Sequence, residues 1–135
     1  MQSLQVRTGQ ISLEILDDAG ESRGIFKFNP TDLESAKKVF FFQKEFDEKQ
    51  KDFEEREKAC ETPEEKINLL AEICDYFNNL IDECFGSGSS QVLFGGAKTL
   101  SMYDDFIQGI LPYYDKASND RVASKAQKYK SKKSS

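Results

Sequence analysis

A long amphipathic segment that ends at a glycine is the feature that most constrains how this chain can fold. From Glu64 to Cys84, apolar residues recur at spacings of three and four, the pattern of an α-helix that buries one side. We expect the helix to end at Phe85-Gly86, because glycine readily adopts the left-handed conformation that closes a helix C-terminus. A polar loop over residues 86–90 and the short apolar run Val92–Phe94 follow. The apolar stripe comprises Ile67, Leu70, Cys74, Phe77, Ile81 and Cys84, widened by Leu69, Ile73 and Leu80.

A second long helix is predicted before this one. Thr62 and Pro63 are typical of a helix start, with an N-cap threonine and a proline at the first helical position. The preceding helix is predicted from about Leu33 to about Ala59, after Pro30. Because only a few residues separate the two helices, we expect an antiparallel helical hairpin. One side of the earlier helix carries Val39, Phe42, Phe46 and Phe53.

Three consecutive aromatic residues, Phe40, Phe41 and Phe42, interrupt the periodicity of the earlier helix. They point around much of the helix, so one buried side cannot cover all three. Either the triplet sits in a crowded core, which is the favoured interpretation, or part of it contacts another subunit.

The N-terminal quarter of the chain has the pattern of β-structure. Ile11, Leu13 and Ile15 alternate with polar residues, the period of a half-buried strand. Turn-forming residues occupy positions 17–22, and an extended run follows around Phe26 and Phe28. We therefore predict a β-hairpin, with Leu4–Val6 as a candidate third strand. A lone hairpin is marginally stable in water, so it must pack on the helices or pair with another chain.

A third long helix is predicted near the C-terminus. Ser101 can cap its start, and Pro112 is expected to kink or divide it. Beyond Ala117 the apolar content falls, and we expect helix to about Tyr129 at most, then disorder. The apolar side comprises Tyr103, Phe106, Ile107, Ile110, Leu111 and Tyr114.

The whole pattern predicts one domain over residues 1–124, followed by a basic, disordered tail over 125–135. Within the domain, residues 1–30 form a β-hairpin region and residues 31–124 a helical region. The predicted class is mainly α with an N-terminal β-hairpin (α+β), in which a helical hairpin is joined by a third, proline-kinked helix. The tail could contact an acidic partner, although a solvated, frayed terminus is the favoured interpretation.

The composition argues against an enzyme, a metal protein and a nucleic-acid-binding protein. The chain has no histidine, which removes the commonest general base and a common metal ligand. Its three cysteines lack the close pairing of a zinc site, so we expect neither a metal nor a cofactor. The acidic body repels phosphate, so nucleic acid is not an expected partner, although Tyr129 among lysines could stack on a base.

The same composition favours a protein of a reducing cytoplasm. Cys60, Cys74 and Cys84 suit a compartment that keeps thiols reduced, and the latter two fall on the apolar stripe, where they act as small hydrophobes. The first ten residues hold no apolar core of signal-peptide length. No apolar run approaches the roughly 20 residues that a membrane-spanning helix needs, so no membrane is expected as a partner.

Several segments, in order, resemble one family. The chain contains FNPTDLE at Phe28–Glu34, IDECFG at Ile81–Gly86 and SSQVLFGG at Ser89–Gly96. It continues with YDDFIQGILPYYDK at Tyr103–Lys116 and a basic stretch that ends in QKYKSK. Together they resemble the tail assembly chaperones of long-tailed phages and prophages of Gram-positive bacteria. The charged stretch over 43–61 carries none of the resemblance.

This resemblance implies a mostly helical, self-associating protein that acts in the host cytoplasm and catalyses no reaction. Such chaperones bind the long tape-measure protein while tail-tube subunits polymerise around it, and they are absent from the mature virion. The implied partners are the tape-measure protein, the tail-tube protein as a second candidate, and further copies of the chain.

Aromatic side chains in excess of what one side of each helix can bury are the candidate contacts with a client helix or another subunit. The basic tail is a second candidate. The candidate partner-binding residues are Phe40, Phe41, Tyr76, Phe85, Phe94, Lys125, Lys128 and Lys130.

Two other functions remain open. One is a small structural component retained in the phage tail, although such proteins are usually β-rich. The other is a secreted helical hairpin of Gram-positive bacteria, against which the absence of tryptophan, and so of a Trp-x-Gly turn, argues.

Overall fold

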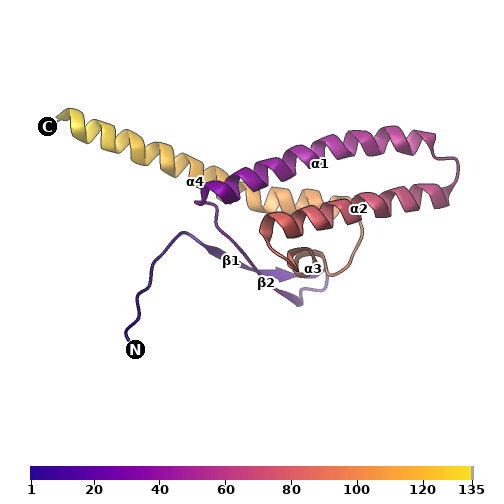
Figure 1. The fold of residues 1–135 in the computed structure, drawn as a ribbon, viewed down its shortest axis with the longest axis horizontal. Coiled ribbons are helices and arrows are strands. Elements are labelled where there is room, and N and C mark those ends of the chain that lie inside the picture. Colours follow the sequence, from indigo (N-terminus) through magenta and orange to yellow (C-terminus); the bar gives the residue numbers. More distant parts are fainter. Residues whose placement is uncertain (135) are drawn as a thin grey trace.

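The structure, a computed structural model, describes the backbone of residues 1–134 and the side chains of residues 1–121. A two-stranded hairpin comes first, and helices follow it, two of which are long and lie side by side (Figure 1). The predicted α+β class, mainly helical with an N-terminal hairpin, is therefore confirmed. The elements are β1 (Ile11–Leu16), β2 (Ser22–Phe28), α1 (Leu33–Ala59), α2 (Pro63–Phe85), α3 (Ser89–Phe94) and α4 (Ser101–Ser134).

The hairpin forms where apolar and polar residues alternate. β1 and β2 pair antiparallel, and Leu13 of β1 lies opposite Phe26 of β2. Paired residues share one face of a sheet. Phe26 is buried, which shows that this face of the hairpin packs on the helices. Asp17 organises the turn: its carboxylate accepts hydrogen bonds from the N–H groups of Ala19 and Glu21, each at 2.9 Å.

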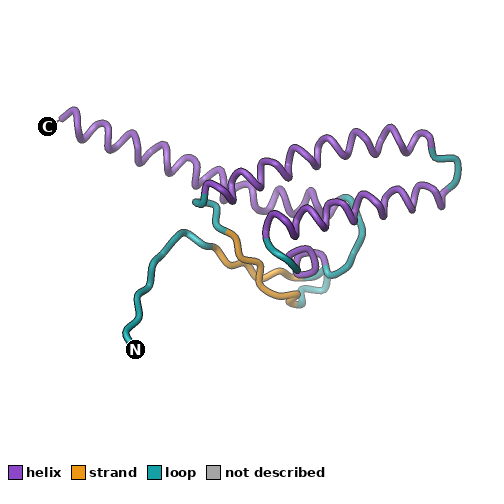
Figure 2. Tube along the Cα trace, viewed as in Figure 1, coloured by secondary structure: helices purple, strands orange, loops and turns teal. Residues whose placement is uncertain are grey.

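The predicted third strand over Leu4–Val6 does not form. The first ten residues are exposed, and they lead away from the hairpin (Figure 2). The physical reason lies at Thr8, whose carbonyl accepts hydrogen bonds from Asn29 Nδ2 at 2.9 Å and from Thr31 Oγ1 at 2.7 Å. These bonds fix the chain beside the start of α1 instead of beside β1.

The two long helices begin as the sequence predicts. Asp32 precedes α1, and its side chain accepts a hydrogen bond from the N–H of Glu34 at 3.0 Å. Thr62 precedes α2 and accepts from the N–H of Glu65 at 3.2 Å. Gly86 closes α2 with a φ of 112°, a positive value as expected, but its ψ of 151° lies outside the left-handed helical region.

The buried side of α2 differs from the predicted stripe at its start. Ile67 is 66% exposed, because the first turns of α2 extend beyond α4, where little chain covers them (Figure 1). Leu70 and Cys84 are half-buried. The buried residues of α2 are Leu69, Ile73, Cys74, Phe77, Leu80 and Ile81.

Aromatic rings join the three long helices in the core. Phe77 of α2 lies 5.1 Å from the ring centroid of Phe46 in α1 and 5.1 Å from that of Tyr103 in α4. The buried Tyr103 hydroxyl lies 2.9 Å from the Cys74 carbonyl and 2.7 Å from Asn78 Oδ1, so its single proton always has an acceptor. The predicted apolar side of α4 is confirmed for five of its six residues, which are buried, whereas Leu111 is half-buried.

Two details between α2 and the chain end differ from the prediction. The apolar run after the glycine loop is the short helix α3, flanked by Gly88 and Gly95 in left-handed conformation. α4 continues through Pro112 without being divided, since solvent can satisfy the carbonyl group that the proline leaves unpaired on this exposed side. It also continues beyond Tyr129, the predicted end of helix.

Candidate protein interaction site

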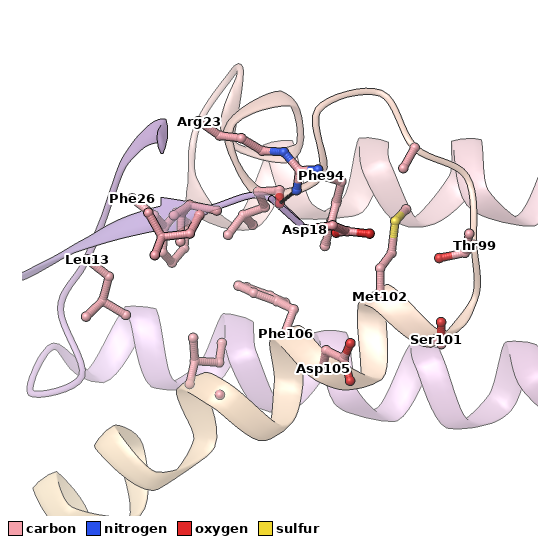
Figure 3. A pocket seen from close by; sticks show the side chains of 16 residues that line it. Leu13, Asp18, Arg23, Phe26, Phe94, Thr99, Ser101, Met102, Asp105 and Phe106 are labelled. Atoms are coloured by element: carbon pink, nitrogen blue, oxygen red, sulfur yellow. Dashed lines mark hydrogen bonds between the residues drawn. The ribbon is translucent and has the colours of Figure 1, made fainter. Parts of the chain in front are cut away.

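An open groove with a volume of about 510 Å³ lies between the hairpin, α3 and the first turns of α4. Figure 3 shows Phe106 reaching from α4 toward Phe26 of β2, with Phe94 of α3 beyond them. The apolar lining comes from four separate elements, so the groove exists only in the folded chain. Its main apolar residues are Leu13, Ile15, Phe26, Phe94, Phe106 and Ile110.

The floor of the groove is formed by aromatic rings that pack edge to face. Phe106 lies 5.7 Å from Phe26, 6.1 Å from Phe94 and 5.5 Å from Phe85, measured between ring centroids. Such contacts contribute roughly 0.5–1.5 kcal/mol each beyond the burial of their area. The floor is therefore formed within the single chain before any partner binds, which lowers the entropy cost of binding to it.

Polar and charged residues also line the groove. Arg23 of β2 makes a hydrogen bond within the chain: its Nη1 donates to the Leu93 carbonyl at 3.1 Å. Asp18 and Asp105 add two carboxylates to the lining. Gly109 of α4 leaves the groove open, because a Cβ built there would meet no atom within 4 Å.

A second surface, distinct from the groove, lies along α1 and α2. Tyr76 of α2 is 37% exposed, and its hydroxyl donates to Glu45 Oε2 of α1 at 2.5 Å. Lys49 Nζ lies 4.8 Å from the centroid of the same ring. Phe41, one helical turn before Glu45, is 50% exposed, so we call Phe41, Glu45, Lys49 and Tyr76 the α1–α2 face.

Acidic residues surround the tyrosine of this face. The hydrogen bond to Glu45 is the main cause that raises the pKa of Tyr76 to about 12, followed by burial and by negative charge. Glu48 and Glu83 contribute to that charge. The α1–α2 face therefore combines exposed aromatic area with several carboxylates, beside the ammonium group of Lys49.

The aromatic triplet of α1 is divided between core and surface. Phe42 is buried, whereas Phe40 is 53% exposed and Phe41 is 50% exposed. The favoured interpretation, a triplet within a crowded core, is therefore wrong for two of its three members. Successive residues of a helix diverge by about 100°, so Phe40 and Phe41 face different directions.

The other candidate binding residues have different surroundings. Phe94 is buried at the floor of the groove and only 6% exposed, so the prediction that it stays on the surface is wrong. Phe85 is half-buried against Phe26, with 5.3 Å between ring centroids. The side chains of three further candidates lie outside the described residues: Lys125, Lys128 and Lys130.

The groove was not predicted from the sequence. Its strand residues, such as Leu13, and its helix residues, such as Phe106, carry ordinary core patterns. Periodicity shows which side of an element is apolar, but not whether two apolar sides meet completely. The only local signal is Gly109, a glycine within the predicted helix whose missing side chain leaves space.

Within the described part of the chain, metal-ligating side chains form no cluster of the kind that a metal site needs. No cluster of three or more His, Cys, Asp or Glu side chains could hold a metal ion there, and no polar or charged residue is buried. Cys74 is buried and Cys84 half-buried, and burial raises the pKa of both thiols. Both thiols pack with the core as predicted.

Comparison with known proteins places the chain in a family. It belongs to the family described as "Family of unknown function (DUF6673)", which matches residues 24–135. The match begins within β2 and includes α1, α2 and α3. No curated protein and no solved structure matches the chain.

Proposed function

We propose that this chain is a tail assembly chaperone of a long-tailed phage or prophage, which binds the tape-measure protein and promotes assembly of the tail tube without catalysing a reaction. The ordered sequence segments that resemble such chaperones suggest the function. The observation that carries it in the structure is the α1–α2 face, where Phe41 and Tyr76 stay exposed on adjacent long helices.

The chemistry of this face suits a helical client. A tape-measure protein is a long, largely helical chain whose apolar stripes would aggregate if they stayed exposed. Two parallel rows of side chains on neighbouring helices can hold such a stripe in the helix-in-groove manner. The carboxylates of Glu45, Glu48 and Glu83 favour a client helix that carries lysine or arginine beside its apolar stripe.

The proposal includes self-association, the host cytoplasm as the place of action, the tail-tube protein as a second partner, and absence from the finished tail. In the part of the chain that the structure describes, no helix combines the length and the apolar character needed to cross a membrane.

Purification of the tagged chain from cells that are assembling phage tails tests this function. Mass spectrometry should identify a long tape-measure protein in the bound fraction, and should not detect the chain in purified particles. The alternative function, a structural component retained in the tail, predicts the reverse. A chain found at fixed stoichiometry in particles would contradict the chaperone proposal.

A further inference from the structure

We propose that the N-terminal arm, residues 1–10, of one copy docks along the free edge of β1 in a second copy and places Leu4 and Val6 over the groove. The inference rests on the self-association included in the proposed function, and it does not depend on the tape-measure client. Its occupant is therefore a second copy of this chain.

The arm is built to reach away from its own chain. Gly9 has a φ of 96°, and a Cβ at this position would come within 2.3 Å of Thr31 Oγ1. The Thr8 carbonyl is bound by Asn29 and Thr31, so the arm cannot fold back onto its own β1 without losing two hydrogen bonds. The arm leaves the body of the protein at this point (Figure 1).

The arm carries apolar residues that nothing covers within its own chain. Leu4 is 88% exposed and Val6 is 71% exposed. Residues two positions apart point to the same face of an extended strand, so both side chains would enter one surface together. Ser3 and Gln5 would point to the opposite, solvent-facing side.

The edge of β1 that would receive the arm carries apolar residues two positions apart, as the arm does. In the described part of the chain, β1 pairs with β2 alone, which leaves its other edge able to accept a strand. Leu13 and Ile15 point from β1 into the groove and are only half-buried. A strand added at this edge would continue the same apolar face across the groove, into the space that Gly109 leaves open.

Charge favours the same pairing. The arm carries Arg7, and it has no acidic residue. The groove supplies Asp18 and Asp105, and neither carboxylate forms an ion pair within the described residues. Its one cation, Arg23, donates to the uncharged Leu93 carbonyl and keeps its charge, so the two carboxylates exceed the cationic charge of the lining by one. A positive arm thus meets a negative groove.

Light scattering of the purified chain over a range of concentrations, without any client, tests this inference. We expect the wild type to self-associate and the Leu4→Asn/Val6→Asn variant to raise the dissociation constant about tenfold or more. The matched control, Ser3→Asn/Gln5→Asn, places the same uncharged residue on the opposite side of the arm and should leave the constant unchanged.

A change in the groove tests the other partner of the contact. Gly109→Phe places a ring in the space that the arm would fill, and should weaken self-association to a similar extent while circular dichroism shows retained helix. A wild type that is monomeric at every concentration would overturn the inference. So would an oligomer that neither the Leu4 and Val6 changes nor Gly109→Phe weakens.

The experiments can contradict either proposal without contradicting the other. If the arm variant loses self-association but still binds the tape-measure protein, the client proposal stands on the α1–α2 face. If self-association withstands every arm and groove variant while client binding is present, the arm inference alone is wrong.

Discussion

At the scale of single residues, the groove depends on a position where a side chain is absent. Gly109 lies in the interior of α4, where glycine costs about 1 kcal/mol relative to alanine. No atom lies within 4 Å of the Cβ that alanine would add. The glycine therefore lowers the stability of the helix and keeps the groove open.

Gly109→Ala is accordingly expected to raise the free energy of unfolding by about 1 kcal/mol in urea denaturation. Gly20→Ala is the matched control, because its Cβ would also meet nothing within 4 Å but its φ of 82° suits only glycine. The control should lower the stability. A lower stability for Gly109→Ala would show that the helix is not continuous at this position.

Single residues also show where the sequence alone does not predict whether a side chain is buried. Ile67 continues the apolar spacing of α2, yet it is exposed because this end of α2 extends beyond α4. Phe94 looks like a surface residue of a glycine-rich loop, yet α3 turns it inward against Phe106. A six-residue helix between glycines is too short to have a recognisable period.

At the scale of elements, local chemistry predicts most boundaries. Pro30 and the capping residues Asp32 and Thr62 define where α1 and α2 begin, and strict alternation defines the hairpin. The groove could not be predicted in this way, because its lining comes from β1, β2, α3 and α4 together. Only the packing of these elements shows that their apolar sides are incompletely covered.

The basic end of the chain is a further element with a testable role. Truncation after Ala123 removes five lysines and should weaken client binding about tenfold, the sum of several exposed ion pairs of about 0.2–1 kcal/mol each. The five are Lys125, Lys128, Lys130, Lys132 and Lys133. Binding by the full chain should also be more sensitive to salt than binding by the truncated chain.

Replacement of all five lysines by glutamine is the matched control for the truncation, since it removes the charge and keeps the length. Equal losses in the two variants, measured by isothermal titration calorimetry, would assign the effect to charge. Undiminished binding after truncation would show that the tail does not contribute to client binding.

At the scale of the whole molecule, the structure separates two exposed surfaces. The α1–α2 face is aromatic and acidic and is formed by two long helices. The groove lies between the hairpin, α3 and α4, beside the free edge of β1. A chaperone that self-associates and binds a client needs two surfaces of this kind, so that one contact does not exclude the other.

The measurement that tests the central claim most directly is the amount of soluble tape-measure protein obtained by co-expression with this chain. Wild type should keep the tape-measure protein soluble and co-purify with it, whereas Phe41→Asp should reduce the bound amount about tenfold, the effect of losing one binding hot spot. Ile67→Asp is the control, because it changes another exposed apolar residue, 66% exposed against 50% for Phe41, that points away from Tyr76 on α2. A tape-measure protein that stays insoluble with wild type, or that binds wild type and Phe41→Asp equally, would contradict the account.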